Sequence, residues 1–359
     1  MSDLSLDFPF AHGGPVGEAN FRVEPADFVV DEQLGFEPSG DGEHLLLHLR
    51  KTNQNTRWLV GQLAERAQVR PADVGYCGLK DRRAVTSQWF SLYLPKRELD
   101  VTDLCAIEGV ELLQSGRHPR KLRRGTHRAN RFRIRLGSLT GDRSTLQQRL
   151  QAVAEQGVPN YFGEQRFGHN GGNLQQFQDG FVHRSGDDRA RYKRQSGKGK
   201  RGGQSSLYVS AGRSYLFNRV LAKRVEEGTW NQLMPGERDS SGPLWGRGRS
   251  NVSEAVSMLE KATADSLPGW CDALEHSGLS QERRPLKLLP DEWNWQFCGQ
   301  DLQLEFSLPP GCYATAVLRE LAHLVVSRDI VAPSPAVVSN DSVNGAATGI
   351  ESNNNRSDG

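Results

Sequence analysis

Alternating apolar and polar positions predict several strands in the first half of the chain. The clearest alternation lies over residues 131–136, where three arginines alternate with Phe132, Ile134 and Leu136. A period of two is typical of a strand with one apolar face and one charged face. Shorter apolar runs predict three more strands, at Phe28–Glu32, His44–Leu49 and Trp89–Leu94.

Apolar residues at helical spacing predict helices between and after these strands. Asn55 can cap a helix that continues to Ala67. Ser144, with Gln147 three residues later, resembles a capping box and predicts a helix that ends at Gly157. In the second half of the chain the same reasoning predicts three helices and one strand, which are helices at Ser214–Glu227, around Val252–Ala262 and at Tyr313–Val326, and a strand at Leu302–Phe306.

The amino-acid composition changes twice along the chain. Residues 158–305 are rich in Gly, Gln and Arg, and we expect them to form a second domain. From about Val331 the chain is rich in Ser, Asn and Gly and has few large apolar residues. Such a segment cannot bury enough surface to offset its ordering entropy, so we expect residues 331–359 to be a disordered tail.

The composition is that of a globular protein, with 36% hydrophobic and 25% charged residues among 359. No run approaches the ~20 apolar residues of a membrane span, and the N-terminus has no basic region followed by an apolar run. We therefore expect a cytoplasmic protein that does not contact membranes. The five cysteines form no C-x-x-C pair, so we predict reduced structural thiols and no metal; they are Cys77, Cys105, Cys271, Cys298 and Cys312.

A net charge of +2 hides two basic blocks. The first extends from Arg117 to Arg135 without any acidic residue, and the second from Arg184 to Arg201. Local basic blocks in a balanced chain are expected where one face meets a polyanion. In the first block, the arginine face of the predicted strand suits a phosphate backbone. The alternative is a solvated surface, or for the second block a flexible loop.

The densest candidate for chemistry is the segment from Gly75 to Trp89. Asp81 lies there between Lys80 and two arginines, downstream of glycines that permit a tight turn. Nearby cations favour the ionised carboxylate, and an ionised Asp that is partly desolvated can act as a nucleophile or a base. On these residues alone, a turn aspartate with solvated basic neighbours is the simpler interpretation.

The segment Gly78–Gln88 resembles the G-x-K-D-x-x-A-x-T-x-Q motif of the tRNA pseudouridine synthase D family. Other blocks similar to family motifs follow in the family's order up to about residue 328: Pro25–Glu32, Gly40–His44, Asn55–Thr56, Gly157–Gly168, Ser210–Asn218 and Leu308–Thr315. So many blocks in one order do not arise by coincidence.

The resemblance implies an α/β (α+β) fold whose catalytic domain has a mixed, largely antiparallel sheet. Residues 1–157 and 306–330 would form this pseudouridine synthase domain, and residues 158–305 an inserted α/β domain. It also implies a cofactor-free isomerase that breaks the N–C glycosidic bond of a uridine, turns the uracil and rejoins it through carbon. The expected substrate is the uridine at position 13 in the D arm of tRNA, notably glutamate tRNA, after base flipping.

The family's catalytic aspartate falls on Asp81. Whether it attacks the sugar, attacks the base or removes a sugar proton stays open. Family positions also map to Asn130 and to Phe132, which the resemblance expects to stack on the target base, whereas the strand pattern makes Phe132 a core residue. We further expect substrate contacts from Lys80, from Arg22 just before the Pro25–Glu32 block, and from Arg166. The block that contains Arg166 is rich in Phe and Tyr, so packing at a domain junction is an equal alternative for it.

Arg22 departs from the family, which often has lysine there. Arginine keeps the charge, so positioning of phosphate or substrate survives the change, but a role that needs a titratable amine does not.

Two other functions are compatible with parts of the sequence. A non-catalytic RNA-binding protein would hold RNA in a basic cleft between the two expected domains, as the enzyme would, but Asp81 favours an enzyme. A phosphoryl-transfer enzyme would need clustered carboxylates or a phosphate-binding Gly-rich loop before a helix, and neither is evident. We expect tRNA as the partner, no obligate protein partner, and a monomer.

Overall fold

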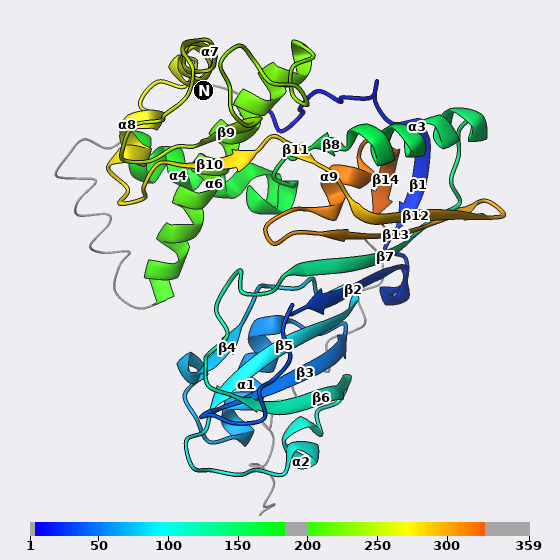
Figure 1. Ribbon diagram of the computed structural model, residues 1–359, viewed down its shortest axis with the longest axis vertical. Coiled ribbons are helices and arrows are strands. Elements are labelled where there is room, and N and C mark those ends of the chain that lie inside the picture. The colour runs from blue at the N-terminus through cyan, green and yellow to red at the C-terminus, as the bar shows by residue number, and fades with distance from the viewer. Residues whose placement is uncertain (1–3, 184–199, 327–359) are drawn as a thin grey trace, which may run out of the picture. The chain divides into compact units, whose positions relative to one another are not determined.

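The computed structural model describes residues 4–183 and 200–326, which belong to one compact unit (Figure 1). Its centre is a ten-stranded sheet, built from β1 (Gly17–Phe21), β2 (Phe28–Gln33), β3 (His44–Thr52), β4 (Val74–Tyr76), β5 (Val85–Tyr93), β6 (Val110–His118), β7 (Ala129–Gly137), β12 (Asp291–Cys298), β13 (Asp301–Leu308) and β14 (Ala322–Val326). The main path is β12-β13-β7-β2-β5-β3-β6. Only β1–β14 and β2–β5 pair in parallel among these strands. The expected mixed, largely antiparallel sheet is confirmed.

Two groups of helices bury the apolar positions of this sheet. Near β3 and β5, the core includes side chains of α1 (Thr56–Arg66) and α2 (Val101–Cys105). Near β7 and β13, it includes side chains of α3 (Arg143–Gln156) and α9 (Ala314–Leu318). Phe132, Ile134 and Leu136 all lie in this second core, as their alternation predicts.

The segment between α3 and β12 has a core of its own. It contains α4 (Gly172–Phe177), α6 (Lys200–Glu226), α7 (Glu254–Asp265), α8 (Trp270–Glu275) and two short ribbons, β8 (Val158–Pro159) with β11 (Lys287–Leu288) and β9 (Ser241–Leu244) with β10 (Glu282–Pro285). Aromatic side chains such as Tyr215 and Trp270 fill this core. The inserted domain at 158–305 stays a prediction, and strand pairing of β12 shows that the chain has rejoined the large sheet at Asp291.

Most predicted elements are present. Asn55 caps α1, because its side chain accepts from the backbone N–H of Arg57 at 2.8 Å. The capping box at Ser144 is wrong. The N-cap is Asp142, two residues before Ser144, whose carboxylate accepts from the backbone N–H of Thr145, and α3 begins at Arg143. No described helix is both long and apolar enough to span a membrane.

The expected helix Tyr313–Val326 is also wrong. The short helix α9 ends at Leu318, and Ala322–Val326 forms the strand β14, which pairs in parallel with β1. Between them, the buried carboxylate of Glu320 accepts from the backbone N–H groups of Ala11 and His12 at 3.3 and 3.1 Å. Pairing with β1 and this anchor override the helical spacing, and the β-branched end of the segment suits a strand. The expected tail and most of the second basic block lie outside the described residues.

Candidate active site

Asp81 lies on an irregular loop between β4 and β5, and the turn between β3 and α1 holds this loop in place. The buried ammonium of Lys51 donates to the carbonyl of Gln54 at 2.7 Å and to the carbonyl of Asp81 at 3.4 Å. The hydroxyl of Thr56 accepts from the backbone N–H of Lys80 at 3.1 Å. Burial lowers the pKa of Lys51 to about 8, and the nearby Asp81 opposes that shift.

Two donors from distant parts of the sequence occupy the two oxygens of the Asp81 carboxylate. A guanidinium nitrogen of Arg22 donates to Oδ2 at 2.8 Å, and the amide of Gln165 donates to Oδ1 at 3.1 Å. Arg22 comes directly after β1, whereas Gln165 lies in the 3-10 helix Glu164–Arg166. The Asp81 side chain is 31% exposed, so a substrate can reach it.

Two aromatic rings and the local backbone conformation hold the side chain of Arg22 in place. Its φ is +58°, in the left-handed region, and its guanidinium lies 3.9 Å from the ring centroid of Phe28 and 4.8 Å from that of Phe21. Stacking of this kind suits the planar arginine group. The side chain is only 12% exposed.

Lys80 belongs to a buried polar network beside Asp81. Its ammonium pairs with the carboxylate of Glu32 at 2.5 Å and donates to the side-chain oxygen of Asn130 at 2.8 Å. The amide nitrogen of Asn130 in turn lies 3.1 Å from Nε2 of His127. Burial lowers the pKa of His127, so the neutral ring can accept from this amide. The network therefore fixes both the position and the orientation of the Asn130 amide.

A cavity of about 230 Å³ joins these groups. Its lining includes Asp81, Lys80 and Asn130, and the rings of Phe28 and Phe132. Gln165 and the four residues at and just before the start of α9 also line it, namely Cys312, Tyr313, Ala314 and Thr315. An ionised carboxylate beside aromatic faces can act on a planar base that stacks there.

Comparison with known proteins identifies the family. The family model of tRNA pseudouridine synthase D (TruD) matches residues 10–176 and 248–321. The chain is 45% identical over 333 residues to tRNA pseudouridine synthase D of Cellvibrio japonicus, which covers 90% of this chain and 95% of that protein. It is 44% identical over 352 residues to the Marinobacter nauticus protein of the same name, with 91% and 98% covered. The chain belongs to the tRNA pseudouridine synthase D family.

It is accordingly an isomerase of the pseudouridine synthase type. A crystal structure described as tRNA pseudouridine synthase D from Methanosarcina mazei shares the fold, with a TM-score of 0.62 at 20% identity, and covers 88% of this chain and 96% of that one. All six expected site residues lie within the first segment that the family model matches, residues 10–176.

Five of the six expected site residues meet at the cavity, and one does not line it. Arg166 donates to the hydroxyl of Tyr313 at 3.1 Å and to the hydroxyl of Ser210 at 2.9 Å. Its neighbour Gln165 contacts Asp81 instead, and sequence reasoning missed that residue. The Gly157–Gly168 block pointed to this segment, but nothing in the sequence tells which of two adjacent side chains of a 3-10 turn faces the cavity.

Phe132 satisfies both interpretations that the sequence left open. It is 7% exposed and packs against Phe306 and Phe28, with ring centroids 5.4 and 6.0 Å away. It also lines the cavity. A ring held by two other rings is a rigid platform.

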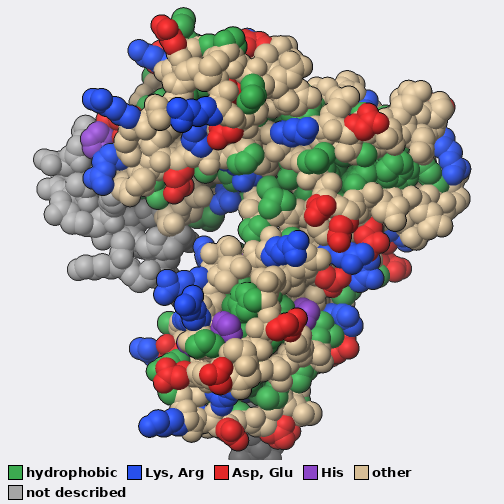
Figure 2. Space-filling model, viewed as in Figure 1, with side chains coloured by type: hydrophobic (Ala, Val, Ile, Leu, Met, Phe, Trp, Pro, Cys, Tyr) green, Lys and Arg blue, Asp and Glu red, His purple; other side chains and the backbone are tan. Residues whose placement is uncertain are grey.

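The arginine face of β7 differs from our expectation. Because side chains alternate along a strand, the arginines lie on the face opposite to Phe132 and the cavity. Each has a carboxylate partner: Arg131 with Glu305 at 2.9 Å, Arg133 with Asp31 at 3.3 Å, and Arg135 with Asp27 at 3.1 Å and Asp301 at 2.8 Å. Figure 2 shows acidic and basic side chains intermingled near β7 and β13. This face is not an open row of charges for phosphates.

Glu32, Cys77 and His127 bring potential metal ligands within 4.8 Å of one another. The ammonium of Lys80 already pairs with Glu32 and supplies a positive charge there. Burial raises the pKa of the Cys77 thiol to about 12, which keeps it protonated. The three residues fit a hydrogen-bonded cluster around Lys80 better than a cation site.

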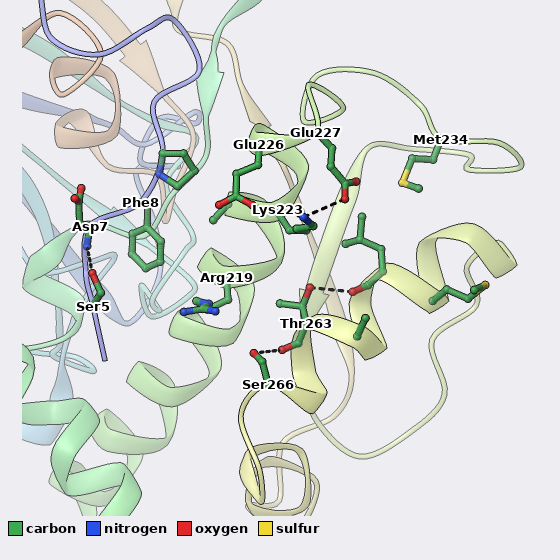
Figure 3. A pocket seen from close by; sticks show the side chains of 15 residues that line it. Ser5, Asp7, Phe8, Arg219, Lys223, Glu226, Glu227, Met234, Thr263 and Ser266 are labelled. Atoms are coloured by element: carbon green, nitrogen blue, oxygen red, sulfur yellow. Dashed lines mark hydrogen bonds and ion pairs between the residues drawn. The ribbon is translucent and has the colours of Figure 1, made fainter. Parts of the chain in front are cut away.

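A larger cavity, of about 550 Å³, lies between α6, α7 and the N-terminal segment (Figure 3). Its charged lining is largely satisfied within the chain, since Lys223 pairs with Glu226 at 3.7 Å and with Glu227 at 3.4 Å. Apolar side chains such as Phe8 and Met258 make up much of the rest. It contains none of the residues that the family resemblance assigns to chemistry.

Proposed function

We propose that this protein converts uridine to pseudouridine at position 13 in the D arm of tRNA, notably glutamate tRNA, with Asp81 as its catalytic carboxylate. The observation that carries the proposal is the Asp81 carboxylate, held by Arg22 at the edge of a cavity that Phe132 and Asn130 also line. Each of the three chemical routes begins with one ionised carboxylate next to the nucleoside. We also propose that the protein acts in the cytoplasm as a monomer.

The target nucleotide has to leave the helical stack before it can reach this cavity. Base flipping costs a few kcal/mol, and stacking on an aromatic ring returns about 1–3 kcal/mol per base. Phe132 is the candidate platform because neighbouring rings hold it rigidly. A flat apolar platform also lets the detached uracil turn, because stacking does not depend on the orientation of the base within its plane.

Polar groups around the cavity have complementary roles in this proposal. Arg22 donates a charge-assisted hydrogen bond to the carboxylate and fixes the direction of Oδ2. The Asn130 amide, oriented by Lys80 and His127, is placed to hydrogen-bond the base or the ribose. Gln165 donates to Oδ1, and its amide oxygen is a further acceptor for the substrate.

The test uses tRNA from cells that lack this protein, complemented with wild type, Asp81→Asn or Asp41→Asn. Asp41 is an exposed residue outside the helices and strands and serves as the matched control. We expect pseudouridine at position 13 with wild type and Asp41→Asn and none with Asp81→Asn, which should still bind tRNA nearly as well as wild type. Near-normal product from Asp81→Asn would refute the assignment of Asp81. Product at another position only would refute the proposed target.

A further inference from the structure

The connection between β6 and β7 forms a turn that internal hydrogen bonds and buried side chains hold in place. Leu122 is 2% exposed, and its backbone N–H donates to the hydroxyl of Ser91 at 3.0 Å. At the other end, His127 is 6% exposed. Between them, the hydroxyl of Thr126 accepts from the backbone N–H of Arg123 at 3.1 Å and donates to its carbonyl at 2.6 Å. We call residues 120–128 the arginine turn.

Four arginines extend from this turn into solvent, and they are Arg120, Arg123, Arg124 and Arg128. No ion pair joins any of the four to a carboxylate of the described residues, in contrast to the paired arginines on β7. Figure 2 shows basic side chains gathered over the region where Figure 1 draws the β6–β7 connection. Within the first basic block, the arginines of the turn are therefore exposed and outside any ion pair of the described residues, whereas those of β7 are neutralised by carboxylates.

The arginine turn lies against the loop that carries Asp81. The backbone N–H of Gly125 donates to the carbonyl of Cys77 at 2.8 Å, four residues before Asp81. His127, which closes the turn, contacts Asn130 at the cavity. Open positive charge thus borders the place where a target nucleotide would enter.

We infer that the arginine turn binds the RNA backbone phosphates next to the extruded uridine, and that the arginine face of β7 does not bind RNA. This inference rests on the proposed function and adds to it the surface that positions the substrate. Phosphate contacts fix the register of a nucleic acid without reading its sequence. A turn anchored at both ends spends little ordering entropy when it binds, and arginine forks suit phosphate oxygens.

The experiment compares two double variants with equal loss of charge, Arg123→Gln/Arg124→Gln on the turn and Arg131→Gln/Arg133→Gln on β7. The dissociation constant for tRNA is measured over a range of salt concentrations. Each lost phosphate contact reduces the slope of log K against log salt by about 0.7–0.9. We expect the turn variant to lose about 1.4–1.8 in slope, and its affinity at low salt to fall on the order of tenfold. The β7 variant should keep the wild-type slope.

Thermal unfolding of both variants checks that they fold, and Arg123→Lys/Arg124→Lys should restore the slope because it keeps the charge. An unchanged slope in the turn variant, or an equal loss in the β7 variant, overturns the inference. These results are separable from a failure of the proposed function, which would appear as wild-type protein that makes no pseudouridine. If the wild type makes product but the turn variant binds tRNA normally, only the assignment of the arginine turn as an RNA-binding surface is wrong.

Discussion

The guanidinium of Arg22 donates to Oδ2 of Asp81 at 2.8 Å while its plane stacks on the ring of Phe28 at 3.9 Å. The two residues are 59 positions apart, since Arg22 follows β1 and Asp81 lies in the loop between β4 and β5. Stacking on Phe28 and the left-handed backbone conformation of Arg22 fix the guanidinium, so the carboxylate of Asp81 meets a partner that is already in position. The carboxylate therefore spends little rotamer entropy on forming the pair.

Arg22→Gln should lower kcat about 10- to 100-fold, because a charge-assisted hydrogen bond of about 1.5–3 kcal/mol is lost at the proposed catalytic group. Arg22→Lys should stay closer to wild type, since the ammonium keeps the charge but not the stacked plane. Single-turnover kinetics on tRNA measure both. Arg50→Gln, which removes an exposed pair with Glu111, is the control and should be neutral. Equal rates for all three variants would contradict a role for the Arg22 charge.

Phe132→Leu should lower kcat/KM about 10- to 100-fold, because an aliphatic side chain fills the core but loses stacking worth about 1–3 kcal/mol. Phe306→Leu is the matched control, since Phe306 packs on Phe132 in the same core and does not line the cavity. Both variants should lose similar stability in urea unfolding. If both also lose equal activity, Phe132 acts through packing and not through the base.

Lys80→Met should destabilise the fold by about 3–5 kcal/mol, because it leaves the fully buried carboxylate of Glu32 without its cation. Glu32→Gln/Lys80→Met removes both charges and should recover much of that loss. Chemical denaturation of the wild type, both single variants and the double variant gives the coupling free energy. Additive losses would mean that the pair contributes little.

Lys51 predicts a specific pH dependence of stability. Its folded pKa of about 8 lies below the unfolded value of 10.5, so the unfolded chain holds one more proton between these limits. The free energy of unfolding should therefore rise between about pH 8 and pH 10.5 through this residue, by about 3 kcal/mol in full. Below pH 8 the burial penalty of the charged lysine is fully present.

The measurement is the difference in unfolding free energy between wild type and Lys51→Met at pH 7.5, 8.5 and 9.5. Subtracting the variant cancels other groups, such as the Cys105 thiol, whose pKa burial raises to about 11 and which opposes the trend above about pH 9. A difference that does not change with pH would mean that Lys51 titrates with its ordinary pKa.

Local signals predicted much of the fold. The Asn55 cap fixed the start of α1, and the alternation around Phe132 fixed both the strand β7 and the side that faces the core. The predicted helix after Tyr313 was wrong because the end of that segment, β14, pairs with β1, which lies about 300 residues away in the sequence. Helical spacing in a short apolar segment cannot report a strand that forms through such a distant pairing.

The candidate site divides in the same way. Motif resemblance supplied Asp81, Asn130 and Phe132, which line the cavity. It could not supply Gln165, because the choice between Gln165 and Arg166 depends on how a 3-10 turn rotates its side chains. Nor could charge counting separate the two halves of the first basic block, since the neutralising acids come from β2, the 3-10 turn before it, and β13.

The parallel pairing of β1 with β14 has a consequence for biosynthesis. Phe21, the residue before Arg22, is in register with Val326, so the last described strand supports the residue that pairs with Asp81. A nascent chain whose residues 322–326 are still inside the ribosome has not formed that pairing. Enzymatic competence should therefore arise only after residues 322–326 have left the ribosome, because β1 lacks its parallel neighbour until then.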